Sequence, residues 1–158
     1  MNRLLPCVMM SLLLVQNAAA QNVVSETVKD PTTYLPMVAT YVSAQLDWNS
    51  SQPYFARGAT EANPRFTQSG RPFSAPLSYS DGNRTIVVDA LSVGALSVAN
   101  NVAMRMIERR FESRDPAHQP TWRRLGRIER IVFASVAAFE MSHLHFEQWR
   151  NNLSAPLR

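Results

Sequence analysis

The chain contains almost no cysteine and almost no lysine. Its only cysteine, Cys7, lies close to the N-terminus, so residues 21–158 contain no thiol. This excludes a disulfide, a thiolate zinc site and a cysteine nucleophile in that part of the chain. Lys29 is the only lysine, and the other fifteen basic residues are arginines. With 158 residues, 46% hydrophobic and 18% charged, the composition excludes a wholly disordered chain and allows one domain with a sizeable core.

Strand-like alternation, internal repeats and known catalytic motifs are also missing. The sequence has no Ser-His-Asp constellation, no phosphate-binding glycine loop and no zinc-protease motif. Glu140 and His143 have the spacing used in di-iron bundles, but the second Glu-x-x-His that such sites need does not occur. We therefore expect no metal and no cofactor, although a metal site with an acid from another helix stays open. An enzyme is the less favoured class, but helical bundles host many chemistries.

Residues 1–20 are typical of a signal peptide. Arg3 provides the positive charge, Leu4–Val15 is apolar apart from Ser11, and Ala18–Ala20 provides small residues for cleavage. The apolar run is shorter than the roughly 20 residues of a membrane span. We therefore expect an exported bacterial protein of the periplasm or cell envelope, with residues 21–158 as a single helical domain. An uncleaved N-terminal anchor is the alternative.

The spacing of apolar residues predicts three helices, and so an all-α fold. The first covers about residues 31–52, with Asp30 as N-cap and Pro53 at its end. The second covers about 81–114 and the third about 121–151. Between Pro53 and Gly82 the helical spacing disappears, while prolines and glycines accumulate. This stretch is predicted to be a long connector that packs back on the helices through its aromatic residues.

The predicted helices carry apolar lines. The first helix has Leu35, Val38, Val42 and Leu46, and the third has Leu125, Ile128, Val132, Val136, Phe139, His143 and Phe146. His143 is therefore expected to be a core histidine, whereas His145 is expected to point into solvent. The second helix is an apolar cylinder with a narrow stripe of polar and small residues, so its first twenty residues are largely buried or lie in lipid.

Two locations stay open for the helical domain. Residues 85–104 contain thirteen apolar side chains in twenty, but Asp89, Asn100 and Asn101 make this a marginal membrane span. Between Arg105 and Arg130 lie eight arginines and four acids. If the chain begins outside and only the second and third helices cross, this basic loop is cytoplasmic, as the positive-inside rule expects.

The same arginines are also explained without a membrane. Arg105 with Glu108, and Arg109 with Glu112, have the spacing of ion pairs on a solvated helix face. We favour a soluble or peripherally attached envelope protein and keep a membrane-embedded helical hairpin as the alternative.

Two aspartates are candidate site residues. Asp47 and Asp89 lie on the polar sides of their helices, so both are placed to face a shared interior. A buried carboxylate has a raised pKa unless it is paired, which suits acid–base work. In the membrane hairpin, Asp89 and His143 would form a buried site for a proton, a metal or a small ligand. The structural alternative is that each aspartate bonds a polar neighbour and sets the helix register.

A short pattern runs from the end of the first helix into the connector. Asp47-Trp48-Asn49-Ser50-Ser51 is followed by Gly58-Ala59-Thr60-Glu61-Ala62-Asn63-Pro64. This resembles small uncharacterised bacterial helical proteins, several of them predicted to be membrane-embedded, and the resemblance implies no known activity. Asn63 must turn because it precedes a proline. We expect Asp47, Glu61 and Asn63 to form one polar cluster, either a binding pocket at the mouth of the bundle or a structural clasp for the connector.

The basic region suggests a partner. Arg123, Arg124 and Arg127 are the proposed centre of an interaction face for an anionic lipid headgroup or another envelope component. Nucleic acid is not expected, because the arginines alternate with acids and no aromatic stacking surface accompanies them. The most favoured function is a binding or structural module of the cell envelope, and the sequence does not determine its oligomeric state.

Overall fold

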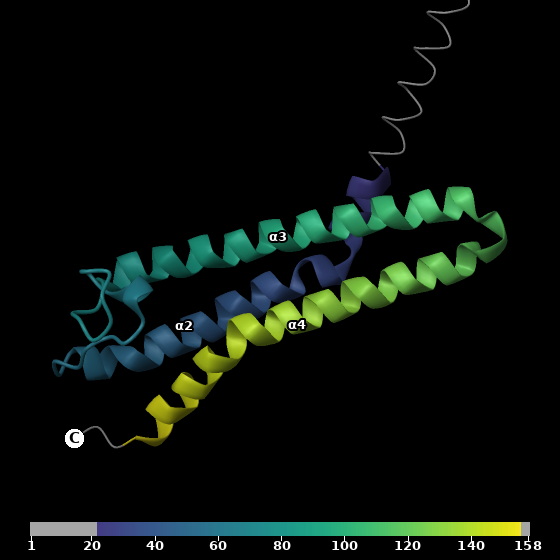
Figure 1. Cartoon of the computed structure of the whole chain (residues 1–158). Coiled ribbons are helices and arrows are strands. Elements are labelled where there is room, and N and C mark those ends of the chain that lie inside the picture. Colours follow the sequence, from purple (N-terminus) through teal and green to yellow (C-terminus); the bar gives the residue numbers. More distant parts are fainter. Residues whose placement is uncertain (1–21, 156–158) are drawn as a thin grey trace, which may run out of the picture.

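The computed structural model describes residues 22–155, and their fold is all-α, as predicted (Figure 1). Three long helices dominate: α2 (Leu35–Phe55), α3 (Tyr79–Arg114) and α4 (Gln119–Ser154). Short 3-10 turns precede or join them, namely η1 (Pro31–Thr33), η2 (Pro64–Phe66) and η3 (Pro116–His118). Residues 22–29 are also helical. The predicted signal peptide, residues 1–20, lies outside the described residues.

The three long helices form an elongated bundle. Helices α3 and α4 have 36 residues each, about 54 Å at 1.5 Å per residue, and η3 joins them into an antiparallel hairpin. Helix α2 packs against both, from partway along the hairpin to its open end (Figure 1). We call the end with η3 the hairpin end, and the end with residues 56–78 the connector end.

Local signals explain where the elements begin and end. The Asp30 carboxylate accepts a hydrogen bond from the Thr32 backbone N–H, so Asp30 is an N-cap as predicted, but it caps η1, and α2 begins only at Leu35. The Ser78 hydroxyl accepts from the Asp81 backbone N–H, so α3 begins at Tyr79, slightly before the predicted start. Helix α2 continues past Pro53, which lies in its last turn and costs only one intrahelical bond there.

The interior of the bundle is made mainly of small side chains. The buried residues repeat at spacings of three and four along each helix, so each helix presents one narrow stripe to its neighbours. They are Pro36, Thr40, Ser43, Ala44, Trp48 and Ser51 in α2, then Gly82, Ile86, Ala90, Val93, Gly94, Ser97 and Asn101 in α3, and Gly126, Arg130, Ala134, Ala138 and Ser142 in α4. Small side chains let the helix backbones approach closely.

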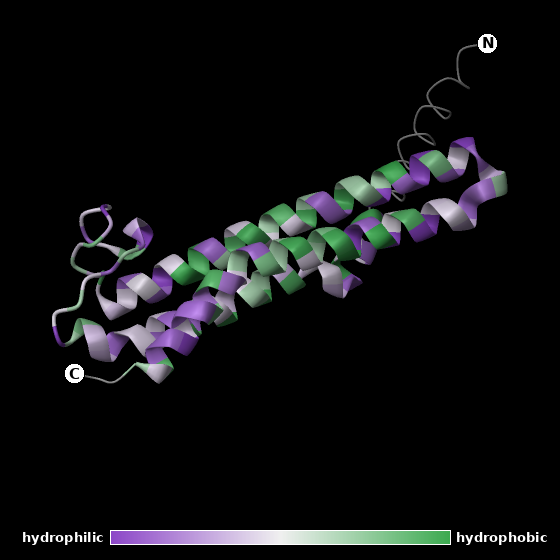
Figure 2. Cartoon of the chain, turned by 60° about the horizontal axis from the view of Figure 1, so that its bottom comes forward, coloured by the Kyte–Doolittle hydropathy of each residue, from purple (hydrophilic) through white to green (hydrophobic). Residues whose placement is uncertain are grey.

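The large apolar side chains lie mostly on the outside, which corrects the predicted direction of the apolar lines. Val38 in α2 is 49% exposed, and Leu96 in α3 and Phe139 in α4 are each 61% exposed. Leu35, Val42, Leu125, Ile128, Val132 and Val136 are exposed as well. Figure 2 shows hydrophobic residues gathered in the middle of the bundle and hydrophilic ones towards both ends. Each helix carries both a line of large apolar residues and a stripe of small residues. The stripe of small residues is the one that is buried, because it allows the helices to pack closely.

The densest core lies at the connector end. Trp48, Phe66, Ile86 and Ala44 form a buried cluster, with Phe55 and Leu77 packed against it. The connector is folded on itself by isolated bridges between Glu61 and Ser74 and between Thr67 and Pro76. Phe66 carries the connector into the core, as the sequence suggested, whereas Phe73 stays 75% exposed. This packing brings connector residues to the ends of α2 and α4.

Candidate functional site

The connector end holds a polar cluster where residues 61–63 meet α2 and α4. Asp47, Glu61 and Asn63 line one small cavity of about 20 Å³, together with Ser51 and His145. The structure thus brings together the three residues that the sequence pattern placed in one cluster. Their role in binding stays a prediction. The cavity is large enough for about one water molecule, so it is no pocket for an organic ligand.

Asp47 and His145 form a polar link between α2 and α4. His145 Nδ1 lies 2.7 Å from Asp47 Oδ2, and the exposed fractions of the two side chains are 26% and 19%. The His145 ring also stands edge-on to Phe66, with ring centroids 6.5 Å apart. The expectation that His145 points into solvent was wrong. It lies three residues after the buried Ser142, on the side of α4 that meets α2.

Glu61 closes this cluster from the connector. Its carboxylate accepts a hydrogen bond from the Asn63 backbone N–H at 2.7 Å. Burial, and then the nearby charge of Asp47, raise the pKa of Glu61 above its usual value, against the lowering effect of that hydrogen bond. The cluster therefore contains a carboxyl group that takes up a proton more readily than it would in water.

The predicted pairing of Asp89 with His143 is wrong. Asp89 pairs with Arg65 of the connector, whose Nε lies 2.9 Å from both carboxylate oxygens. His143 stacks on Phe139 of its own helix, with ring centroids 4.8 Å apart, and its Nδ1 lies 3.0 Å from the Phe139 carbonyl oxygen. His143 is thus no core residue. The ring is half-buried and lies against the exposed Phe139 at the edge of the bundle.

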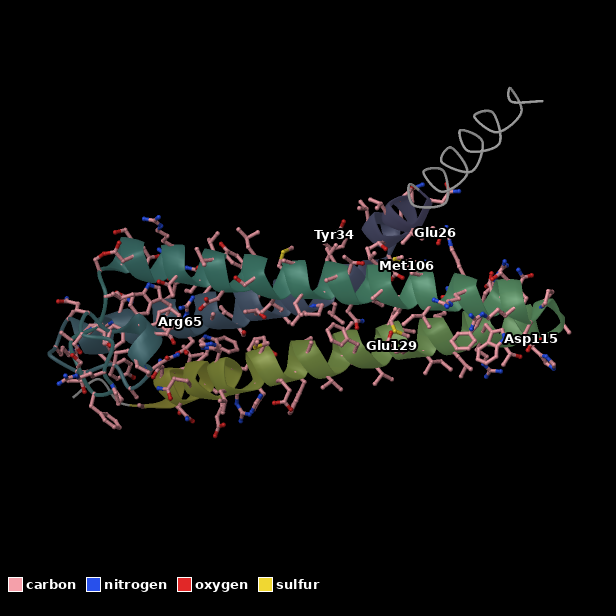
Figure 3. All side chains as sticks on the ribbon, turned by 45° about the horizontal axis from the view of Figure 1, so that its top comes forward. Glu26, Tyr34, Arg65, Met106, Asp115 and Glu129 are labelled. Carbon is pink, nitrogen blue, oxygen red and sulfur yellow. The ribbon has the colours of Figure 1, made fainter. Side chains whose placement is uncertain are left out.

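A second cavity lies next to the polar cluster. It has a volume of about 260 Å³, and its lining includes Arg65, Asp89 and His145 with apolar residues of all three long helices. His145 lines both cavities. Figure 3 shows Arg65 at the connector end of the bundle. Across residues 22–155, no three His, Cys, Asp or Glu side chains gather closely enough to hold a metal ion.

The hairpin end carries a network of ion pairs centred on Asp30. Arg105 Nη2 lies 2.6 Å from Asp30 Oδ2, and Arg130 Nε lies 3.4 Å from the same oxygen. Burial alone would raise the pKa of Asp30, but hydrogen bonds from Thr32 and the charges of Arg105 and Arg130 hold it below its usual range. Arg130 is 7% exposed and also bonds Glu108 at 2.8 Å.

Two arginines of α3 also form ion pairs with another element. Arg105 and Arg109 both bond Glu26, at 3.1 and 2.9 Å. Figure 3 shows Glu26 beside α3. Ion pairs of Glu26 and Asp30 with arginines of α3 and α4 hold residues 22–30 against the hairpin. Sequence spacing alone gave no signal for Glu26, because its partners are about 80 residues away.

The three arginines proposed as an interaction face divide into two kinds. Arg123 bonds Glu112 with its Nε 2.7 Å from Oε1, so it helps to hold α3 against α4. Arg124 and Arg127 are exposed. Arg127 also lines a wide, open hollow whose other residues include Lys29 and Ile131. A contact of Arg124 and Arg127 with an anionic partner stays a prediction.

Compared with protein-family models, with curated proteins and with solved structures, the chain shows no significant match. The resemblance to small bacterial helical proteins therefore stays a prediction.

Proposed function

We propose that this chain is a small membrane-embedded helical bundle of the bacterial cell envelope, serving as a binding or structural module rather than as an enzyme. One observation carries the proposal: small residues make up most of the interior, while most of the large apolar side chains point outwards. In water this arrangement would leave much apolar area exposed, which opposes folding. In lipid it is the expected arrangement, because helices associate there through close packing of small residues.

Helix α3 is the best candidate span. Among the described residues it is the one helix that is long and apolar enough to cross a membrane, and 33% of its most apolar window is buried. A helix in the core of a soluble protein would bury most of that window. From Arg84 to Asn101, α3 is about 26 Å long, close to the roughly 30 Å of a bilayer core. Its acid in this stretch, Asp89, is paired with Arg65.

Helix α4 has a shorter outward-facing apolar stretch than α3. Between the buried Arg130 and the exposed Glu140, its outward apolar residues are Ile131, Val132, Val136 and Phe139. A charged residue facing the bilayer centre is costly, so Glu140 places the connector end of α4 near the membrane surface. The polar Asp47–His145 pair lies at the same end of the bundle.

The ion pairs at the hairpin end give the bundle a testable orientation. Glu26 and Asp30 contact Arg105 and Arg130, so residues 22–30 and the basic α3–α4 turn lie on one side of the membrane. The positive-inside rule favours the cytoplasm for this arginine-rich side. A cleaved signal peptide would instead leave residue 22 outside. We therefore propose a cytoplasmic hairpin end, an exterior connector end, and no cleavage after residue 20.

Membrane fractionation with cysteine labelling tests both parts of this proposal. The sequence has a single cysteine, so Cys7→Ser provides a cysteine-free background for Phe73→Cys at the connector end and Arg124→Cys at the hairpin end. We expect the chain to resist a carbonate wash. An impermeant maleimide should label position 73 in intact cells and position 124 only after permeabilisation. A chain in the soluble periplasmic fraction would overturn the membrane assignment, and the opposite labelling would overturn the orientation.

A further inference from the structure

A cleft between α3 and α4 opens at the hairpin end. It has a volume of about 460 Å³, within the range of small-molecule sites. Its walls are almost wholly apolar and are formed by Met104, Ile107, Phe111, Trp122, Leu125, Gly126, Ile128 and Val132, with Glu108 and Glu129 as the acidic members. Phe111 and Trp122 stack at 4.7 Å between ring centroids near the turn.

The cleft lies on a different face of the hairpin from the ion-pair network. On α3 the network uses Arg105, Arg109 and Glu112, whereas the cleft uses Met104, Ile107 and Phe111. At 100° per residue these two sets are centred roughly 130° apart around the helix, and Glu108, which lines both hollows, lies between them. Residues 22–30 bond the network side, so they leave the cleft open.

Glu129 gives the cleft its chemical character. Its Oε1 accepts a long hydrogen bond, 3.4 Å, from the Asn100 amide. Its Oε2 is buried and has no hydrogen-bond partner among the described residues. Glu108, the other acid, is bonded to Arg130 at 2.8 Å. Figure 3 shows Glu129 on α4, which faces α3 here. A buried carboxylate oxygen without a partner is costly, and a bound donor would remove that cost.

We propose that this cleft binds a lipophilic amine, with its apolar body between α3 and α4 and its ammonium group on Glu129. The apolar walls account for the body of the ligand, and the unpaired carboxylate oxygen accounts for a positively charged donor rather than a hydroxyl or an acid. The site is independent of the membrane orientation, because every residue of the cleft belongs to the hairpin itself.

Three ligands with one apolar body test the charge requirement. The purified full chain in a non-ionic maltoside detergent would be titrated with 4-phenylbutylamine, 4-phenylbutanol and 4-phenylbutyrate at neutral pH, following thermal unfolding. We expect saturable stabilisation by the amine, with about tenfold weaker binding of the alcohol and weaker binding still of the acid. Equal binding of amine and alcohol, or no saturable binding of the amine, would overturn the proposal.

Two acid variants on α4 locate the ammonium. Glu129→Gln should weaken amine binding about tenfold and leave alcohol binding unchanged, whereas Glu140→Gln, an exposed acid outside the cleft, should leave both unchanged. If Glu129→Gln keeps full amine affinity, or if both variants lose it equally, Glu129 does not recognise the amine. Should Glu129→Gln fail to fold, Trp122→Phe decides: an amine-induced fluorescence change in the wild type must disappear in this variant.

Discussion

Replacing Gly82 by alanine tests how closely α2 and α3 pack. A methyl group on Gly82 would overlap the indole ring of Trp48, which is itself buried in the core at the connector end. The ring has little room to move, because Phe55 and Phe66 each lie 5.5 Å from it between ring centroids. The helices must therefore separate or the indole must leave its position.

The expected magnitude follows from two opposing effects. Overpacking a dense core costs about 1–3 kcal/mol. Alanine in place of a helical glycine regains up to about 1 kcal/mol. We expect Gly82→Ala to lower the free energy of unfolding by about 1–2 kcal/mol, or roughly 2–8 °C in Tm. Thermal unfolding in detergent, followed by circular dichroism, measures this change.

Gly94→Ala is the matched control on the same helix. Its methyl group would lie 2.9 Å from Met37 Sδ, and an unbranched thioether moves aside easily. The helix-propensity gain then offsets the remaining strain, so we expect a change of less than about 1 kcal/mol. Equal effects of the two alanines would refute the reasoning. So would additive effects of Gly82→Ala and Trp48→Phe, because a smaller ring should relieve the overlap.

Three further predictions concern charges. Asp30→Asn keeps the N-cap but removes the carboxylate beside the buried Arg130. In a denaturant titration at neutral pH it should lower the free energy of unfolding by about 3 kcal/mol. Because the folded pKa of Asp30 is lowered, this loss should fade as the pH falls below 3.8. Glu61 has a raised folded pKa, so its burial destabilises the fold increasingly as the pH rises above 4.5; Glu61→Gln should reduce that decline, and an unchanged pH–stability curve would contradict the assignment. Reversing Arg124 and Arg127 to glutamate should weaken binding to anionic vesicles, most clearly at low salt, and equal flotation of wild type and variant would remove them from the interaction face.

At the connector end, the sequence pattern correctly predicted which polar residues lie together. Asp47, Glu61 and Asn63 do line one cavity, since the turn forced by Asn63-Pro64 returns the chain to the end of α2. The partners of this cluster were not predictable in the same way. His145 and Asp47 are 98 positions apart in the sequence, so no local signal pairs them. The apolar line of the third helix pointed to His143 as the core histidine instead.

The sequence by itself determined the helices and the connector. Apolar spacing, Asp30 as a cap and the proline-rich stretch are local signals, and helix formation is a local process, so the element boundaries agree closely with the structure. Only the tertiary structure decided which face of each helix is inside. Small and large residues form parallel stripes on every helix, and hydrophobicity alone favours burying the larger ones. Close approach of α2, α3 and α4 requires glycine, alanine and serine between them, so Val38, Leu96 and Phe139 face outwards. The tertiary structure also decided the ion pairs, because their partners lie on different elements far apart in the sequence.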